Sequence, residues 1–293
     1  MNSFGIETDA EKGTKGYSYR TLTERLLSAG IGDTDTCKYE AAILLEHFCS
    51  VRRAMLLACR DEIFFSEALA EAVEKRCAHH PLQYLIGEWQ FCNETYTVTP
   101  DCLIPRMDTE ILVEAAQELL PSNGRFIDLC TGSGCIAISL LSARRDATGI
   151  AVDLFPNTLN VAQRNAERNR VSDRLSFLEA DVLKSEFMHS LGSFDLILSN
   201  PPYIPSAVVD GLSAEVQKEP RAALDGGEDG LVFYRKLISE YLPFLSEGGR
   251  MILEIGYDQW DALQGLAKER GIPIELRKDL GGNDRVVILT PVR

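Results

Sequence analysis

The segment from Asn200 to Tyr203 has the residue types and the order best suited to chemistry in this sequence. It directly follows an apolar run at 194–199, which predicts a buried strand, and ligands of open α/β sheets bind where such strands end. Pro201 and Pro202 stiffen the turn and remove two backbone donors. The side-chain oxygen of Asn200 and the carbonyl of Pro201 are then left as rigid acceptors, and Tyr203 supplies a flat face.

Two fixed acceptors suit a planar NH2 group. An amide or an aromatic amine is a weak nucleophile because its lone pair is delocalised, and acceptors on both N–H bonds orient it and raise its electron density. A sulfonium methyl can then approach in line, and no strong general base is needed because the proton can leave after transfer. Such positioning can contribute about 7–11 kcal/mol. We therefore predict that Asn200, Pro201 and Tyr203 are catalytic, and that Pro202 completes the substrate site with them.

A second segment, at 126–141, predicts a strand, a glycine-rich turn and a helix. Glycines let the backbone turn tightly and approach a ligand, and the helix behind them presents free N–H groups. The turn alone also fits a dinucleotide-binding fingerprint, so a nicotinamide cofactor stays open at this point. The turn residues predicted to contact a cofactor are Thr131, Gly132, Ser133 and Gly134.

Three carboxylates at strand ends favour S-adenosylmethionine (SAM) over a dinucleotide. Asp128 would repel a pyrophosphate, but it suits the cationic amino group of a methionine moiety. Asp153 ends the next strand, where a carboxylate can accept both ribose hydroxyls. Asp181, followed by Val182, comes after a third strand, where an acidic side chain can receive the exocyclic amine of adenine. These residues and the turn together predict a SAM site.

Strand and helix patterns alternate from residue 125 onward, which predicts a largely parallel sheet covered on both faces. A helix over 108–120, with Thr109 as its cap, precedes the sheet. The expected strands are 125–129, 149–152, 175–179, 194–199, 250–255, 274–277 and 285–289.

The first third of the chain has a different pattern. Residues 1–16 are expected to be disordered, and 17–81 to form a small helical substrate-recognition domain. Thr21 and Glu24 have capping-box spacing and predict the start of its first helix. Aromatic and β-branched residues at 82–105 predict a β-hairpin linker, and the methyltransferase domain is expected over 106–293.

Charge and composition limit the classes of function. The formal charge of −14, from 30 basic and 44 acidic side chains, disfavours a grip on nucleic acid and favours a protein or small-molecule substrate. No apolar stretch is long enough to cross a bilayer and the polar start lacks a signal-peptide pattern, so we predict a cytoplasmic protein without membrane contact. The eight cysteines form no CxxC pair, which predicts free thiols and no metal site.

A series of sequence blocks resembles the release-factor N5-glutamine methyltransferases, the family also called HemK or PrmC. The blocks occur in the order typical of that family and cover nearly the whole chain. They are PLQYLIGEWQF, LIPRMDTEILVE, DLCTGSGCIAI, AVDLFPNTLNVAQRN, SNPPYIP, EPRAALDGGEDGLVFYRKL and KDLGGNDRVV.

The resemblance implies a Rossmann-like class I SAM-dependent methyltransferase domain, with a seven-stranded, mostly parallel sheet behind a small N-terminal helical bundle. It implies as substrate the glutamine at the Gly-Gly-Gln tip of class 1 peptide chain release factors, held by residues 200–203 with Phe91 beside it. It also implies S-adenosylhomocysteine as product, and we expect a monomer without direct nucleic-acid contact. SAM contacts are implied in the loop from Cys130 to Gly134, at Asp153, near Val182 and at Asn200.

Two positions depart from the family pattern, because Met107 stands where proline is frequent and Cys130 where glycine is frequent. Neither change removes a group that the chemistry needs. Three alternatives remain open: a glutamine methyltransferase of a ribosomal protein, an N6-adenine methyltransferase of nucleic acid, and a binding module without activity. The block IPRMDTE counts against the first, the negative charge against the second, and the intact segment 200–203 against the third.

Overall fold

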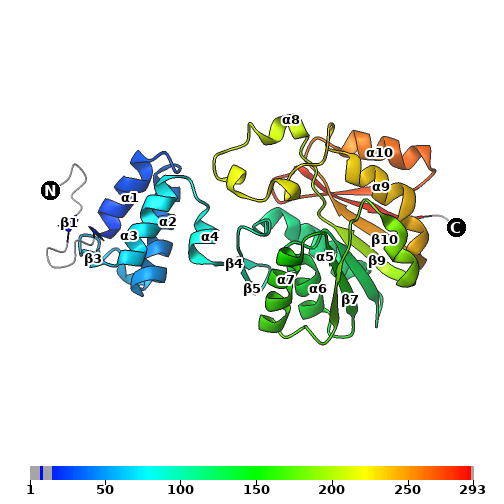
Figure 1. The fold of residues 1–293 in the computed structure, drawn as a ribbon, viewed down its shortest axis with the longest axis horizontal. Helices are drawn as coiled ribbons and strands as arrows, with labels where there is room; N and C mark the ends of the chain where they lie inside the picture. Colours follow the sequence, from blue (N-terminus) through cyan, green and yellow to red (C-terminus); the bar gives the residue numbers. More distant parts are fainter. Residues whose placement is uncertain (1–6, 9–14, 292–293) are drawn as a thin grey trace. The chain divides into compact units, whose positions relative to one another are not determined.

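The structure of the protein, a computed structural model, describes residues 7–8 and 15–291. The chain divides into two compact units (Figure 1). Unit 1 comprises Met1–Gly87 and Ser213–Lys218, and unit 2 comprises Glu88–Leu212 and Glu219–Arg293. Most of the segment predicted to be disordered, 1–16, lies outside the described residues. Over the described ranges, no helix is both long and apolar enough to cross a membrane.

Unit 1 is a helical bundle with a small sheet that the sequence did not predict. Its first helix begins one turn earlier than expected, because the capping box joins Ser18 to Thr21 rather than Thr21 to Glu24. The side chains of Asp33 and Ser66 cap the next two long helices. The elements are β1 (Glu7–Thr8), β2 (Lys15–Tyr17), α1 (Tyr19–Ser28), α2 (Thr34–Cys49), η1 (Arg53–Met55), β3 (Phe64–Phe65), α3 (Glu67–Cys77) and α4 (Leu82–Ile86).

A buried ion pair lies inside unit 1. Arg76 of α3 is only 1% exposed and donates to both carboxylate oxygens of Glu40 in α2, at 2.6 and 2.8 Å. The same guanidinium reaches Glu215 at 2.6 Å, in the segment that belongs to unit 1 although it is distant in sequence. This network joins two helices and that segment through one side chain.

Unit 2 begins with the β-hairpin that the sequence predicted. The hairpin is shorter than the expected linker, since residues 82–86 form α4 of unit 1 instead. Its strands are β4 (Glu88–Phe91) and β5 (Glu94–Thr97). The remaining elements are η2 (Met107–Thr109), α5 (Glu110–Leu119), β6 (Arg125–Leu129), α6 (Cys135–Ala143), β7 (Thr148–Asp153), α7 (Pro156–Arg168), β8 (Leu175–Glu179), η3 (Ser185–Ser190), β9 (Phe194–Ser199), α8 (Ser206–Val209), η4 (Val216–Lys218, in the unit 1 segment), η5 (Arg221–Ala223), α9 (Val232–Glu240), η6 (Leu242–Phe244), β10 (Leu245–Glu254), α10 (Trp260–Glu269), β11 (Ile274–Lys278) and β12 (Asp284–Leu289).

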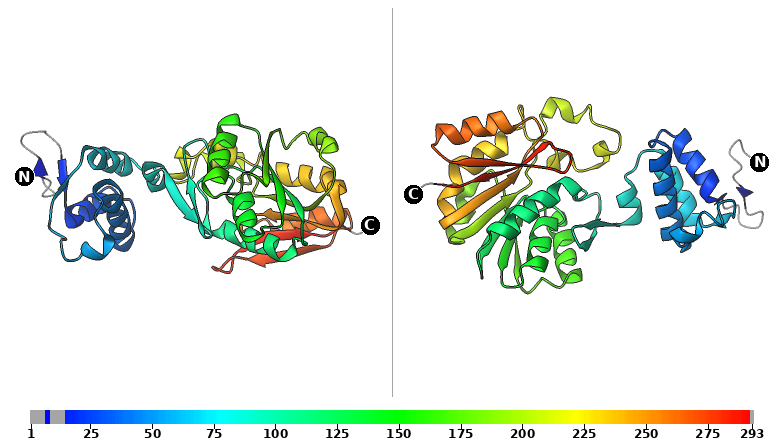
Figure 2. Two further views of the ribbon diagram at one scale, coloured as in Figure 1. Left: turned by 90° about the horizontal axis from the view of Figure 1, so that it is seen from below. Right: turned by 180° about the vertical axis from the view of Figure 1, so that it is seen from behind.

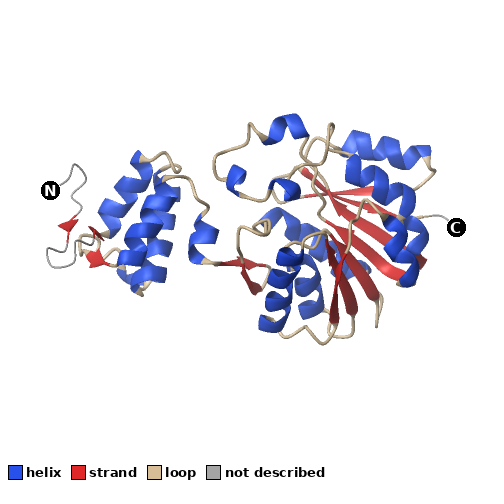
Figure 3. Cartoon of the chain, viewed as in Figure 1, coloured by secondary structure: helices blue, strands red, loops and turns tan. Residues whose placement is uncertain are grey.

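The large sheet of unit 2 has the strand order β11-β12-β10-β9-β6-β7-β8. Its strands pair in parallel except at β12, which runs antiparallel to both neighbours. Helices cover both faces: α5, α6 and α7 pack on one, and α9 and α10 on the other (Figure 2, Figure 3). The predicted Rossmann-like, seven-stranded and mostly parallel sheet is confirmed, and the order reverses between β6 and β9, where ligands of such sheets bind.

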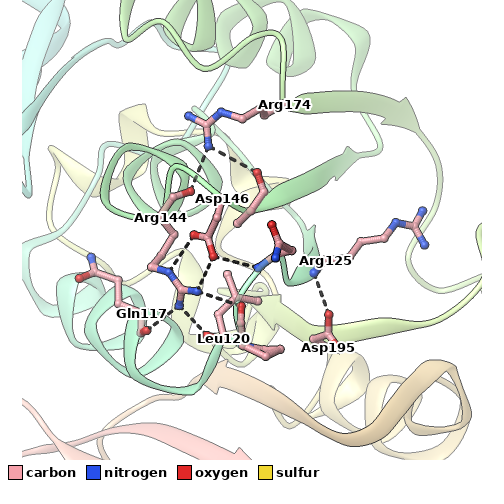
Figure 4. A network of polar contacts seen from close by, with 10 residues as sticks. Gln117, Leu120, Arg125, Arg144, Asp146, Arg174 and Asp195 are labelled. Carbon is pink, nitrogen blue, oxygen red and sulfur yellow. Dashed lines mark hydrogen bonds and ion pairs between the residues drawn. The ribbon is translucent and has the colours of Figure 1, made fainter.

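The amino ends of these strands are held by a polar network (Figure 4). Arg144, just after α6, donates to the backbone carbonyls of Gln117 and Pro121 and pairs with Asp146. Beside β6, the carboxylate of Asp195 accepts the N–H of Arg125 at 2.8 Å. Side chains thus stabilise the amino edge of the sheet, opposite the carboxyl edge where ligands of such sheets bind.

We predict that Arg76→Ala destabilises unit 1 strongly, because it leaves the carboxylate of Glu40 buried without its partner. The expected loss of unfolding free energy is about 3–5 kcal/mol in urea denaturation of the full chain. Arg53→Ala is the matched control, because Arg53 pairs with Glu46 at the surface and its loss should cost about 0–1 kcal/mol. Equal effects of the two variants would contradict the structural role given to the buried pair.

Candidate active site

Strand register brings three predicted site segments together at the carboxyl edge of the sheet. Leu129 at the end of β6 pairs with Val152 of β7 and with Ser199 of β9. The hydroxyl of Ser199 donates to the carbonyl oxygen of Leu129 at 2.7 Å, which ties the last residues of two strands. The next residue of each strand is Cys130, Asp153 and Asn200, so the three lie side by side.

These strand ends open onto a cavity of about 430 Å³ within unit 2, a size suited to a small-molecule cofactor. Its wall also contains residues 101–106, which the sequence did not assign to the site. The predicted residues in the wall are Cys130, Thr131, Gly132, Ser133, Asp153, Asp181, Val182, Asn200 and Pro202.

The glycine-rich turn has the backbone that its sequence predicted. Gly132 and Gly134 have φ of +57° and +82°, values that glycine adopts at little cost. Cys130 also has a positive φ, +60°, which explains physically why glycine suits this position and why the small cysteine is under strain there. The N–H of Gly132 donates to the carboxylate of Asp153 at 3.0 Å. The turn is therefore fixed to β7 as well as to β6.

Asp128 and Asp153 are the buried carboxyls of the site. Burial raises the pKa of both, to about 7 for Asp128. Asp128 lies behind the turn, not in the cavity wall, and one of its oxygens accepts the hydroxyl proton of Thr131 at 2.6 Å. Its other oxygen is buried without a hydrogen-bond partner in the described structure. The predicted contact of Asp128 with a cofactor amine stays a prediction.

The glycine-rich segment at 224–230 packs directly against the turn at 200–203. The N–H of Ile204 donates to Leu224, and the N–H of Gly226 donates back to Ile204, both at 2.9 Å. A Cβ on Gly226 would lie 2.7 Å from the Cα of Tyr203 and 2.8 Å from the carbonyl oxygen of Pro202. Only glycine lets the two segments approach this closely, which explains the block EPRAALDGGEDGL in physical terms.

The cavity wall at 101–106 is tied to the same glycine-rich block. The carboxylate of Glu219 accepts the N–H of Ile104 at 3.0 Å and forms an ion pair with Arg106. Arg106 therefore has a local salt-bridge partner. Glu219 is itself buried, so this pair holds the wall in place.

Several predicted site residues lie close to the cavity without lining it. Gly134, Pro201 and Tyr203 belong to the two turns but are not in the wall. Phe91 is 2% exposed and packs edge-on against Tyr96, with ring centroids 6.0 Å apart, in the core of unit 2. The placement of Phe91 beside a substrate therefore stays a prediction without support from the cavity.

Two family models match the chain, one for each part. The model described as "PrmC N-terminal domain" matches residues 19–87, and the model described as "Methyltransferase small domain" matches residues 106–249.

Full-length relatives agree with these models. A release factor glutamine methyltransferase of Moorella thermoacetica is 40% identical, over 91% of this chain and 95% of that protein. The chain belongs to the release factor glutamine methyltransferase family. The same name is borne by a relative from Geobacter sulfurreducens, 37% identical over 95% of this chain and 91% of that protein. The solved protein-(glutamine-N5) methyltransferase (release factor-specific) of Alicyclobacillus acidocaldarius is 34% identical, covering 68% of this chain and 100% of that one, with a TM-score of 0.40.

Sequence reasoning missed the contacts that support the loops around the cavity. Gln259 donates to the carbonyl oxygens of Tyr203 and Gly230, at 3.0 and 3.2 Å, and so joins both loops behind the cavity. The buried Thr109 stands at the predicted N-cap position of α5, but its hydroxyl makes no capping bond and accepts the side-chain N–H of Asn200 at 3.3 Å. Each contact joins residues far apart in sequence, and only the repeated glycines at 226–230 could have signalled it.

We predict that Gly226→Ala lowers methyl transfer at least about tenfold, because the added methyl displaces the turn at 200–203. SAM affinity should change little, since Gly226 is not in the cavity wall. Steady-state kinetics and calorimetry of SAM binding measure the two effects. Gly265→Ala in α10 is the control, because nothing lies within 4 Å of its Cβ position. Full activity of Gly226→Ala would show that the close approach is not needed.

We also predict that the pH dependence of stability without SAM contains a contribution from Asp128. Its pKa rises from 3.8 in the unfolded chain to about 7 in the fold, so the folded state binds the proton more tightly. The stabilisation is complete below pH 4 and is lost as the pH rises through 7. As the pH rises from 5 to 8, this contribution lowers the unfolding free energy of the wild type by about 2–3 kcal/mol. Asp128→Asn cannot titrate at this position and should not show that part of the loss. If urea denaturation gives the same change of unfolding free energy with pH for both proteins, the contribution of Asp128 is refuted.

Proposed function

We propose that this methyltransferase transfers the methyl group of SAM to the side-chain amide nitrogen, N5, of the glutamine in the Gly-Gly-Gln segment of class 1 release factors. The proposal rests on one observation above the others: Asn200, at the end of β9, faces the same cavity as the glycine-rich turn and Asp153. An acceptor for an amide thus lies beside a cradle suited to SAM. The names of the relatives support the substrate.

The residues of the cavity fit SAM. The turn at 131–134 offers backbone N–H groups at the start of α6, a setting that favours a carboxylate. Asp153 is available at the cavity wall for ribose hydroxyls, and Val182 provides an apolar surface for adenine. The unpartnered oxygen of Asp128 is a buried acceptor next to the turn, which suits the approach of a cationic amine. When bound, SAM supplies an electrophilic methyl group.

The turn at 200–203 is suited to hold a primary amide. Asn200 already donates its N–H to Thr109, so its side-chain oxygen is the atom left for a substrate N–H. The carbonyl of Pro201 can receive the second N–H, and Pro201 and Pro202 have no N–H groups that could compete for it. Two acceptors raise the electron density of the amide nitrogen and fix its direction, and the proton is released to water after the methyl has transferred.

Mass spectrometry of a class 1 release factor, incubated with SAM and the protein, tests the proposal. We expect one added methyl group on the Gly-Gly-Gln glutamine. Asn200→Ala should lower the rate about 100-fold or more while SAM still binds, because it removes an acceptor that acts on the nucleophile. Asn160→Ala, at an exposed position of α7, is the control and should keep full activity.

The alternatives have distinct outcomes in the same assay. Methylation of a ribosomal protein glutamine but not of the release factor would keep the chemistry and overturn the substrate. Methylation of adenine in an oligonucleotide at a comparable rate would overturn the preference for a protein substrate. A monomeric enzyme without nucleic-acid contact remains part of the proposal, and light scattering of the active sample tests the monomer.

A further inference from the structure

We propose that Thr109 is a positioning residue, which holds the side-chain amide of Asn200 in the one orientation that presents its oxygen to the substrate. Glu254 supports Thr109 in this role. The inference rests on the proposed function and names how the amide-binding turn is oriented.

Thr109 is well placed for this task. It lies at the N-cap position of α5, as predicted, with 2% exposure, but its side chain makes no capping hydrogen bond. Its hydroxyl oxygen accepts the Nδ2–H of Asn200 at 3.3 Å, from a residue 91 positions further along the chain. Thr109 and Asn200 both belong to the cavity wall. A side chain from the edge of the cavity is thus turned onto the predicted catalytic amide.

We assign Glu254 as the acceptor of the Thr109 hydroxyl proton. Glu254, at the end of β10, is 1% exposed, and one of its oxygens is buried without a hydrogen-bond partner in the described structure. Burial raises the pKa of Glu254 to about 7, and the neighbouring hydroxyl of Thr109 acts in the opposite direction by hydrogen bonding to the carboxylate. Thr109 can therefore give its proton to Glu254 while it accepts one from Asn200.

The other charged groups around Glu254 are engaged elsewhere. Arg285 forms ion pairs with Asp108 and Asp279, and Arg106 pairs with Glu219. The hydroxyl of Tyr234 donates to the backbone carbonyl of Glu254 rather than to its carboxylate. The hydroxyl of Thr109 is therefore a neutral donor beside the carboxylate, and the phenol of Tyr203 also lies close enough for the charge of Glu254 to raise its pKa.

A fixed direction of the two hydrogen bonds decides which atom of Asn200 is free. With its proton directed to Glu254, the oxygen of Thr109 can only accept, so it selects the NH2 end of the Asn200 amide. A flipped amide would set two acceptor oxygens against each other. The side-chain oxygen of Asn200 accepts no hydrogen bond among the described residues, and it stays available for the N–H of a substrate amide.

Two substitutions at one position test the inference. Thr109→Val keeps the size and removes the hydroxyl, and we expect kcat for release-factor methylation to fall about tenfold or more. Thr109→Ser keeps the hydroxyl and should restore most of kcat. SAM affinity of Thr109→Val should stay near that of Thr109→Ser, and its urea midpoint should fall only modestly, because the buried Glu254 loses one donor. A Val variant with the kcat of the Ser variant would overturn the inference, and so would a fall in stability or SAM affinity that accounts for the whole loss.

A readout without turnover separates this inference from the proposed function. In protein labelled with ¹⁵N-asparagine, the side-chain NH2 signals of Asn200 are assigned by their loss in Asn200→Ala. We expect one of the two protons to exchange more slowly with water in the wild type and in Thr109→Ser, and this protection to vanish in Thr109→Val. If the wild type fails to methylate release factor but shows this protection, the function is wrong and the orientation is right. Equal exchange in all three proteins refutes the orientation.

Discussion

The in-register parallel pairing of β6 with β7 and β9 is the constraint on which the site depends. Because Leu129 pairs with both Val152 and Ser199, the next residue of each strand emerges at the same level of the sheet. One of these residues begins the glycine-rich turn, one is the carboxylate Asp153, and one is Asn200. A shift of register by one residue would turn each side chain to the other face and separate the proposed cofactor cradle from the proposed amide-binding turn.

Much of this arrangement could be predicted from the sequence. Each of the seven expected strands has a counterpart within a few residues. The inner strands β6, β9 and β12 are buried and largely apolar, whereas the edge strands β8 and β11 are partly exposed and have a weaker pattern. The turn at 131–134 and the residues at strand ends could be assigned because they follow the expected strands. Local patterns were less reliable where two capping arrangements were possible. Thr21 was predicted to cap the first helix, but its hydroxyl accepts the backbone N–H of Ser18, and Ser18 is the cap.

The supports of the site could not be predicted, because they depend on contacts between distant segments. Thr109 looks like a helix cap in sequence, and its bond to Asn200 exists only once α5 packs beside β9. Gly226, Glu219 and Gln259 likewise act on loops that the fold brings next to them. The raised pKa values of the buried carboxyls could not be predicted either, because they depend on burial in the finished fold, which raises the pKa of Asp128 and of Glu254 to about 7. Such groups are costly to the fold, which is typical of residues retained for a site.

The orientation of a bound glutamine tests the central claim most directly. A high-resolution crystal structure of the protein with S-adenosylhomocysteine and a Gly-Gly-Gln peptide would locate the amide against the end of β9. The account predicts the amide nitrogen about 2.7–3.2 Å from the side-chain oxygen of Asn200, with the sulfur of the cofactor product on the line of methyl transfer. A glutamine bound away from Asn200, or with its amide oxygen turned toward that residue, would contradict it.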